Sequence, residues 1–401
     1  MIVDLFAGGG GASLGIEMAL GRSPDVAVNH SKDAVAIHEA NHPRTRHLLG
    51  NVWDYAPREV SGGRPVELLW ASPTCTHFSK AKGGPLDRKA ATKVRALAWV
   101  VTRWAREVKP ATIIVENVEA FRTWGPLTNE GRPCERRKGL TFRRWVKSLT
   151  DAGYSVDARE LVAADYGAPT TRKRLFVVAS LSGAPQWPAK THGATAQEGL
   201  FGRLQLWRAA AECIDWSVPC PSIVGRARRL SEATERRIAR GLKKFVIDEP
   251  RPFVVDGSIP WMVHLCNGER AGQSPRIYDL QLPLGTVVAG GVKHGLCRAF
   301  VAKHYGGHES PGADLRVPLS TITTIDHHAL VTAHGEPIVD VGMRALTPRE
   351  LFRAQGFPDS YKIDMLKKTA QVRAVGNSVV PQVAAAIVRA SMVERRGAVA
   401  A

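Results

Sequence analysis

The first 180 residues alternate short apolar runs with segments whose apolar residues recur at helical spacing. Runs that predict strands lie at residues 1–6, 66–71, 112–115 and 175–179. Apolar residues recur three and four apart from Val94 to Val108, which predicts a helix between two of these strands. Such alternation is typical of a doubly wound α/β fold, in which helices cover both faces of a sheet of parallel strands. We therefore expect this fold in the first part of the chain.

The composition and the secondary-structure pattern of the sequence change at about residue 181. Pro and Gly become frequent, and only short β-rich pieces remain, at 286–289 and 320–324. Helix signals return after Asp340, with a helix start at 347–350 and an amphipathic helix at 381–393. At about 150 residues per domain, 401 residues predict two domains. We expect one domain from 1–182 with 340–401, and an inserted, irregular, β-containing domain at 183–339.

The net charge is the outlier in the composition. The 55 Lys and Arg residues against 37 Asp and Glu residues give +18, with a pI near 10. This surplus favours a polyanionic partner, nucleic acid before an anionic membrane, although surplus charge can also serve solubility alone. Residues 183–340 hold 18 basic and 15 acidic residues, so most of the surplus lies outside the inserted domain.

One basic run is dense enough to contact phosphate groups. It contains Arg132, Arg136, Arg137, Lys138, Arg143, Arg144 and Lys147, and a second group after residue 79 contains Lys80, Lys82, Arg88 and Lys89. We expect Arg136, Arg137, Lys138 and Arg143 to bind phosphate groups of a nucleic acid; a solvated helix face is the alternative.

The sequence favours a cytoplasmic protein without a metal. Six scattered cysteines form no CxxC pair, which indicates a reducing compartment. The chain has no run of eighteen apolar residues, so we expect no membrane span. No charged leader precedes the first strand, so we expect no secretory signal. His304, His308 and His327 with His328 lack the acidic or Cys partners of a metal site.

Two loops that follow predicted strands carry candidate chemistry. The first strand ends in Gly8-Gly9-Gly10-Gly11 before a helix, an arrangement that lets a ligand approach the backbone but also makes ordinary tight turns. The second strand ends in Ser72-Pro73-Thr74-Cys75. Ligands bind at the carboxyl ends of parallel strands, so Cys75 is a candidate nucleophile; a small buried hydrophobe is the alternative.

Charged residues stand at the next two strands. Glu116-Asn117-Val118 ends one strand, and Arg172 and Arg174 precede another at alternate positions, which point the same way. A buried Glu116 kept protonated can hydrogen-bond the edge of an amidine-like ring, and the arginines can clamp a carbonyl or an anion. Considered alone, each of these three side chains could also be an ordinary solvent-exposed charge without a specific function.

In order and spacing these motifs resemble those of the DNA cytosine carbon-5 methyltransferases. The resemblance covers about 1–182 and 340–401 and rests on Phe6 to Gly11, Pro73 to Ser79, Glu116 to Val118, Arg172 with Arg174, Arg344 to Pro358, and Gly376 to Val379. It implies a Rossmann-like class I S-adenosylmethionine-dependent fold, with the inserted domain as the target-recognition domain.

The resemblance also implies roles for single residues. Cys75 would add to carbon 6 of a flipped-out cytosine in duplex DNA. Glu116 would contact ring nitrogen 3 and the amino group. Arg174, helped by Arg172, would hold the carbonyl oxygen. S-adenosylmethionine would contact Phe6, Gly8, Gly10, Asn29, Asn51, Val52, Asn377 and Val379. We expect a monomeric enzyme of a bacterial or phage restriction-modification system, but the sequence does not give its recognition site.

The chain departs from the family pattern at several positions. Thr74 replaces the Pro before the Cys, Thr76 and Thr170 replace Gln, and Asn29 and Asn51 stand where acidic residues hold the cofactor. Asparagine can still hydrogen-bond these groups, but without charge assistance. Three alternatives stay open. A covalent Cys on a pyrimidine does not distinguish the sugar, so RNA could be the substrate. Asn29 and Asn51 leave open transfer of a non-methyl group from a modified S-adenosylmethionine, and Thr74 leaves open a catalytically silent DNA-binding protein.

Overall fold

The computed structural model describes residues 1–401 apart from 75–94, 129–131, 200–201, 302–331, 334–335 and 394–401. The chain divides into two compact units. Unit 1 contains 1–208, 285–290 and 352–401, and unit 2 contains 209–284 and 291–351. The boundaries at 182 and 340 thus differ from those of the compact units. Residues 183–208 stay with unit 1 because Trp207 and Lys190 bind Asp165, at 3.1 and 2.8 Å.

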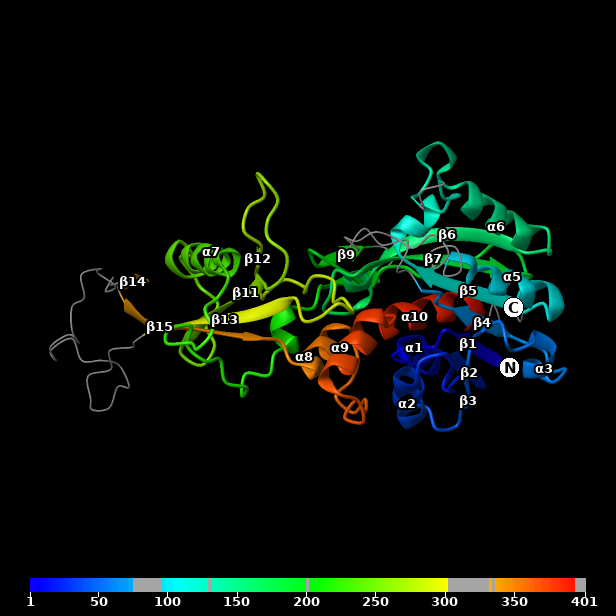
Figure 1. The fold of residues 1–401 in the computed structure, drawn as a ribbon, viewed down its shortest axis with the longest axis horizontal. Coiled ribbons are helices and arrows are strands. Elements are labelled where there is room, and N and C mark those ends of the chain that lie inside the picture. The colour runs from blue at the N-terminus through cyan, green and yellow to red at the C-terminus, as the bar shows by residue number, and fades with distance from the viewer. Residues whose placement is uncertain (75–94, 129–131, 200–201, 302–331, 334–335, 394–401) are drawn as a thin grey trace. The chain divides into compact units, whose positions relative to one another are not determined.

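Unit 1 is built on a seven-stranded sheet with the order β3-β2-β1-β4-β5-β7-β6 (Figure 1). The strands are β1 (Ile2–Leu5), β2 (Val26–Asn29), β3 (Arg46–Leu49), β4 (Leu68–Ala71), β5 (Thr112–Asn117), β6 (Ser155–Val162) and β7 (Lys173–Ser180). The first five pair in parallel, as expected. The expectation of a parallel strand at 175–179 was wrong: β7 pairs antiparallel with both β5 and β6. This reversal brings the start of β7 beside the end of β5.

Helices cover both faces of this sheet, which confirms the doubly wound architecture. They are α1 (Gly11–Leu20), α2 (Lys32–Asn41), α3 (Pro57–Ser61), α5 (Trp99–Glu107), α6 (Leu140–Thr150), α9 (Lys368–Asn377) and α10 (Pro381–Val388). Alternate residues of β1 enter different cores, because successive side chains of a strand point to opposite faces. Ile2 packs with α1 and α10, whereas Val3 and Leu5 pack with α5 and α6.

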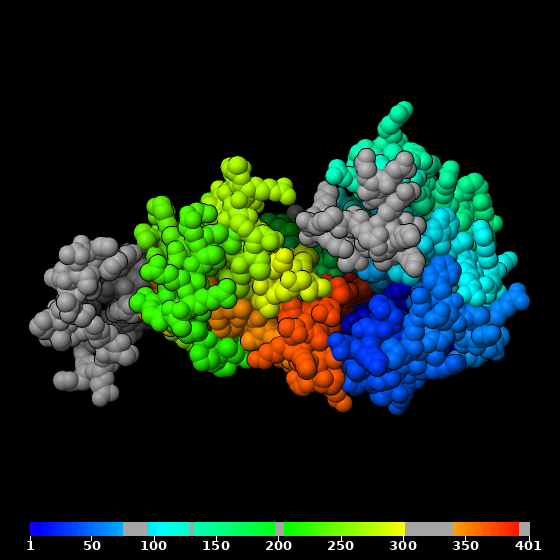
Figure 2. All heavy atoms as spheres, in the orientation of Figure 1, coloured from blue at the N-terminus to red at the C-terminus, as the bar shows by residue number. Residues whose placement is uncertain are grey.

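The two ends of the described chain meet in unit 1. Helices α1 and α10 pack side by side, and the space-filling view shows the early and late segments in contact (Figure 2). A Cβ atom on Gly15 would lie 2.5 Å from Cβ of Ala384 and 2.6 Å from the Pro381 carbonyl oxygen. Glycine at this position therefore permits the close approach of the two helices. No helix of the described residues is long and apolar enough to span a membrane.

Unit 2 has an antiparallel five-stranded sheet with the order β12-β11-β13-β15-β14. Its elements are α7 (Glu232–Gly241), β11 (Ser258–His264), β12 (Ile277–Tyr278), β13 (His294–Val301), β14 (Thr332–Ala333) and β15 (Glu336–Ala345). Residues 340–351 belong here because β15 pairs with β13. The β-piece expected at 286–289 is not a strand, and 320–324 lies outside the described residues.

Three short strands and one helix complete the description. Strands β8 (His192–Gly193), β9 (Gln197–Gly199) and β10 (Gly202–Leu206) form a small sheet in unit 1. Helix α8 (Pro348–Ala354) begins where the Thr347-Pro348 signal predicted. The predicted helix at 381–393 is α10 followed by the π-helical turn η6 (Arg389–Val393).

Candidate active site

The glycine loop after β1 adopts a strained conformation. Phe6 has a φ of 64°, a value that costs energy for any residue other than glycine, and such strain is commonly found at binding sites. A Cβ atom on Gly8 would meet only the Phe6 carbonyl oxygen, at 3.9 Å. The backbone at Gly8 therefore has open space beside it. This opening fits a ligand that approaches the loop, as the sequence predicts for S-adenosylmethionine.

The far end of the chain fixes the same loop. The Gly11 amide donates a hydrogen bond to Oγ of Ser378, at 3.1 Å, and the Tyr361 hydroxyl donates to the Gly9 carbonyl oxygen, at 2.8 Å. Val379 is buried, and a Cβ atom on Gly11 would lie 1.9 Å from its carbonyl oxygen. Asn377, at the end of α9, is exposed. Sequence reasoning missed Ser378 and Tyr361 as partners of this loop.

The two asparagines at the expected acidic positions stand at strand ends but serve the backbone. Asn29 ends β2, its amide donates to the Ala7 carbonyl oxygen at 2.8 Å, and its oxygen accepts from the Ser31 amide at 2.9 Å. Asn51 follows β3, is exposed, and its oxygen accepts from the Trp53 amide at 3.1 Å. Val52 beside it is buried. Each asparagine thus keeps only part of its hydrogen-bonding capacity for a ligand.

The candidate nucleophile Cys75 lies outside the described residues, as do Thr76, Lys80, Lys82, Arg88 and Lys89. The residues before it are anchored. Asn117, at the end of β5, donates from its amide to the Pro73 carbonyl oxygen at 2.8 Å, and its oxygen accepts from the Val118 amide. Thr74 is half-buried. The Asn of the Glu-Asn-Val motif therefore ties the start of the Cys loop to β5, a role that sequence reasoning missed.

Glu116 and Arg174 form a largely buried ion pair at the end of β5. Glu116 is only 7% exposed, and its Oε1 lies 3.2 Å from Nε of Arg174. Burial raises the pKa of Glu116 above its usual value, and the positive charges of Arg174 and Arg172 oppose this rise without cancelling it. The carboxyl group therefore favours its protonated form more than an exposed Glu does.

Arg172 is buried, and its guanidinium group hydrogen-bonds two backbone carbonyl oxygens. Its Nη1 donates to the Val287 carbonyl oxygen at 2.8 Å, and its Nη2 donates to the Gly376 carbonyl oxygen at 3.2 Å. Thr170 hydrogen-bonds Gly285 at 3.5 Å, so residues 285–290 are held to unit 1 by the start of β7. The predicted role of Arg172 in holding the base stays untested, but its guanidinium already serves two carbonyls.

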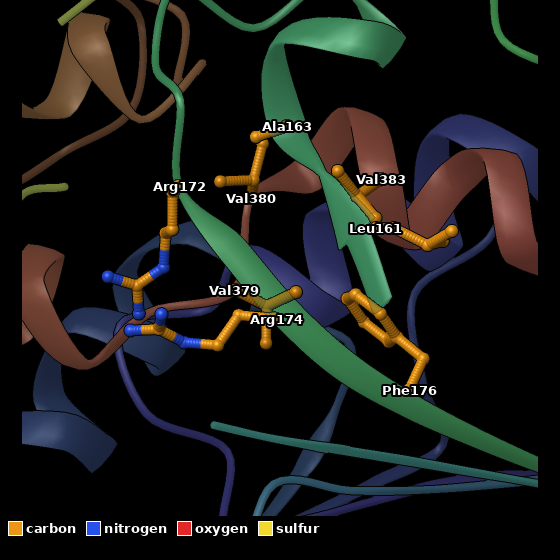
Figure 3. A pocket seen from close by; sticks show the side chains of 8 residues that line it. All are labelled: Leu161, Ala163, Arg172, Arg174, Phe176, Val379, Val380 and Val383. Atoms are coloured by element: carbon orange, nitrogen blue, oxygen red, sulfur yellow. The ribbon is translucent and has the colours of Figure 1, made fainter. Parts of the chain in front are cut away.

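A small cavity of about 10 Å³ separates the stems of the two arginines from α10. Figure 3 shows both guanidinium groups extending in the same direction, away from Phe176, with Val379 and Val380 beside the arginine stems. This space is about that of one water molecule, so it is not a cofactor pocket.

A buried polar chain under the glycine loop was not predicted. Ser13 donates to Oδ2 of Asp4 at 2.7 Å, Nε2 of His38 lies 2.9 Å from Oγ of Ser13, and Nδ1 of His38 lies 2.8 Å from Nε2 of His47. Burial raises the pKa of Asp4 to about 7, although the Ser13 hydrogen bond opposes it. Burial also lowers the pKa of His38 well below its usual value. These residues are far apart in sequence, so no local pattern reveals their contact.

The predicted basic run lies on the surface of unit 1. Arg136 and Arg137 belong to the turn η2 (Glu135–Arg137), Lys138 follows it, and Arg143 lies on α6; all four are exposed. Helix α6 buries Trp145 and Leu149 on its opposite side. Lys138 approaches Glu135 at 3.5 Å. Among the described residues, no group of three or more His, Cys, Asp or Glu side chains could hold a metal ion; His304, His308, His327 and His328 lie outside them.

Known proteins are similar to this chain in sequence. Residues 1–200 and 298–392 match the family of C-5 cytosine-specific DNA methylases. The type II methyltransferase M.SacI of Streptomyces achromogenes is 32% identical over 49% of this chain, which spans about half (52%) of that protein. The type II methyltransferase M.XorII of Xanthomonas oryzae pv. oryzae is 26% identical over 96% of this chain and 82% of its own length.

Solved structures agree on the fold. The methyltransferase EhMeth of Entamoeba histolytica superimposes with a TM-score of 0.56 at 14% identity, over 98% of each chain. The Dnmt2 methyltransferase of S. pombe gives a TM-score of 0.55 at 14% identity, also over 98% of each chain. On the family match across more than half of its residues, the chain belongs to the C-5 cytosine-specific DNA methylase family, which includes the DNA (cytosine-5)-methyltransferases.

Proposed function

We propose that this chain transfers a methyl group from S-adenosylmethionine to carbon 5 of a cytosine flipped out of duplex DNA. The observation that carries the proposal is the buried Glu116 with its raised pKa, paired with Arg174 at the carboxyl edge of the sheet. A carboxyl group with a raised pKa beside a fixed cation can give a proton to a reacting cytosine ring and hold its carbonyl oxygen. Family membership supplies the reaction class.

The chemistry begins at Cys75. Its thiolate adds to carbon 6 of the ring, and the electron pair of the 5,6 double bond moves to carbon 5 as Glu116 gives its proton to ring nitrogen 3. S-adenosylmethionine supplies the electrophilic methyl group that carbon 5 takes. A base then removes the carbon 5 proton, the 5,6 double bond re-forms as the Cys75 thiolate leaves, and ring nitrogen 3 returns its proton to Glu116, which restores the enzyme.

The arginines divide their work in this proposal. Arg174 is half-buried beside Glu116, so its remaining donors can hold the carbonyl oxygen of the base. Arg172 contributes through the backbone, because its two hydrogen bonds fix the carbonyls of Val287 and Gly376. We therefore assign base contact to Arg174 and positioning to Arg172.

The cofactor would lie along the carboxyl ends of β1, β2 and β3. Phe6, Gly8 and Gly10 would line its methionine part, and Asn29, Asn51 and Val52 its adenosine part. Asn377 and Val379 would close the pocket from the far end of the chain. The open space at Gly8 and the position of Asn29 at the end of β2 support this placement.

Duplex DNA is the proposed partner. A cytosine cannot react inside the duplex, and flipping it costs a few kcal/mol that backbone contacts must offset. The exposed Arg136, Arg137, Lys138 and Arg143 would supply such contacts from unit 1, and unit 2 would read the target sequence. The relatives are named type II methyltransferases, which supports a role in restriction-modification in a bacterial cytoplasm.

The asparagines favour a second candidate with the same fold. Asn29 and Asn51 replace carboxylates and spend part of their hydrogen-bonding capacity on the backbone, so the pocket has lost negative charge. Such a pocket tolerates an anionic derivative of S-adenosylmethionine better than an acidic pocket does, and the transferred group would then be larger than methyl.

Nucleoside analysis tests the first candidate with S-adenosylmethionine in vitro, and the second on DNA from an expressing strain, where a group heavier than methyl on cytosine would support it. Purified protein is incubated with duplex DNA, or with tRNA, and labelled S-adenosylmethionine, and the product nucleosides are separated by mass. The proposal predicts 5-methylcytosine in the DNA only, and none with Cys75→Ala. No transfer by the wild type, or label in the tRNA alone, would overturn it. If 5-methylcytosine is found in the DNA, bisulfite sequencing of an expressing strain gives the target site.

A further inference from the structure

Unit 2 contains a hollow of about 730 Å³ whose rim is rich in arginine. The loop before α7 contributes Arg226, Arg228 and Arg229, and the start of α7 contributes Ser231 and Thr234. Leu265 and Met343 complete the lining from the sheet side. The space is far larger than one side chain or water molecule needs, so it can accept an extended ligand.

The arginines of this hollow have no carboxylate partner in the part of the chain that the structure describes, unlike their neighbours. Arg236 pairs with Glu232, and Arg237 pairs with Glu269 at 2.5 Å. No such ion pair joins Arg226, Arg228 or Arg229 to a described carboxylate, and the buried Nη1 of Arg226 finds no hydrogen-bond acceptor among described residues. An anion bound in the hollow would give these guanidinium groups hydrogen-bond acceptors.

The sequence around these arginines is also positively charged. Residues 226–244 hold eight basic and two acidic residues, a net +6, whereas the whole of 183–340 has only +3. The rest of that segment is therefore slightly acidic. Val224, 77% exposed at the rim, adds apolar surface beside the guanidinium groups. Basic charge in the inserted segment is thus concentrated at one place.

We propose that this arginine hollow binds the phosphodiester backbone of duplex DNA. The inference rests on the proposed function, because it takes duplex DNA as the partner and adds a second place where the backbone is held. Guanidinium groups match phosphate oxygens in pairs, and several of them along a hollow follow a chain of phosphates. Unit 2 then grips the backbone in addition to reading bases.

A pair of neutral substitutions tests the hollow. Arg228→Ser with Arg229→Ser removes two exposed guanidinium groups, and Arg251→Ser with Arg270→Ser removes two exposed ones of unit 2 outside the hollow. Binding of a labelled duplex of arbitrary sequence is measured by anisotropy from low to high salt. The slope of log Kd against log salt should fall by roughly two for the first pair and stay unchanged for the second.

The outcomes separate this inference from the proposed function. Equal slopes for the two double variants would overturn the hollow as a backbone site while methyl transfer by the wild type still stands. A wild type that neither binds nor methylates duplex DNA would overturn both. Thermal melting of the variants should match the wild type, because the substituted side chains are exposed, so a lower slope reports lost contacts.

Discussion

Nε of Arg174 lies 3.2 Å from Oε1 of Glu116, which joins the start of β7 to the end of β5. The contact exists because β7 runs antiparallel to β5, so that a residue at the start of one strand meets a residue at the end of the other. A carboxyl group and a guanidinium cation that burial holds together in this way can polarise a ring bound against them.

Glu116→Gln should reduce kcat for methyl transfer by roughly 10²–10⁴-fold and leave the Kd for S-adenosylmethionine unchanged. Gln keeps the shape of the side chain but cannot give a proton to the base. The wild-type rate should fall as pH rises through the Glu116 pKa, which lies above its usual value, because the protonated form is the active one.

Glu119→Gln is the matched control for this variant, since Glu119 is exposed in the 3-10 turn that follows β5. It should keep the wild-type rate. An active Glu116→Gln variant, or one whose pH profile keeps the wild-type fall at high pH, would contradict the role of Glu116 as a proton donor.

Arg172→Lys and Arg174→Lys should fail in different ways. Lysine cannot reach both carbonyls that Arg172 bridges, so its variant should lose about 2–4 kcal/mol of unfolding free energy in a urea titration. Arg174→Lys should lose less than about 1 kcal/mol of stability but roughly 10²-fold in kcat. The reverse order, a stable but inactive Arg172→Lys with a destabilised Arg174→Lys, would contradict the division of work.

Asp4→Asn should flatten the dependence of stability on pH. Burial raises the pKa of Asp4 from 3.8 to about 7, so the native state favours the protonated acid, and stability is lost as pH rises towards 7. Relative to the variant, the wild type should lose about 2–3 kcal/mol between about pH 5 and pH 8.

His38, His42 and His47 have lowered pKa values and act in the opposite direction, so only the difference between wild type and Asp4→Asn isolates Asp4. Chemical denaturation at a series of pH values measures it. Parallel curves for the two proteins would mean that Asp4 is ionised in the folded state across this range.

Tyr361→Phe should weaken cofactor binding about fivefold without changing kcat at saturating S-adenosylmethionine. The lost hydroxyl donates to the Gly9 carbonyl oxygen, and a neutral hydrogen bond contributes about 1 kcal/mol. Tyr154→Phe is the control, because its buried hydroxyl also donates to a carbonyl, that of Pro110, away from the glycine loop. Calorimetry should show a changed Kd for the first variant only; equal values for both would refute the positioning role.

Arg136→Glu with Arg137→Glu should weaken binding to every DNA sequence alike and lower the salt slope by about one unit per lost phosphate contact. The exposed pair Arg44→Glu with Arg58→Glu removes the same charge elsewhere on unit 1. If the two double variants bind duplex DNA with one slope, the run on η2 and α6 is a solvated face.

Local patterns predicted much of unit 1. The apolar runs at β1, β4 and β5 and the glycine turn before α1 were readable because a buried strand needs continuous apolar residues. The direction of β7 was not readable, since parallel and antiparallel buried strands have the same composition. The placement of 285–290 in unit 1 depends on Arg172, more than a hundred residues away along the chain.

The candidate site also has contacts that the sequence implied and contacts that it did not reveal. The resemblance implied that Glu116 and Arg174 contact the same base, but their own contact depends on the antiparallel direction of β7, which no local pattern predicted. Asp4 with Ser13 and His38, and Tyr361 with Gly9, are contacts between distant segments whose residue types suit an ordinary surface equally well. The cluster of arginines in unit 2 was masked by the nearly neutral average of its segment.

Covalent trapping tests the central claim most directly. Duplex DNA that carries 5-fluorocytosine at the target site is incubated with the protein and S-adenosylmethionine, and denaturing electrophoresis separates the products. A fluorine at carbon 5 cannot leave as a proton does, so the account predicts a stable protein–DNA adduct that disappears in Cys75→Ala and persists in Cys134→Ala. Methylation of ordinary duplex DNA without any adduct, or an adduct that survives Cys75→Ala, would contradict it.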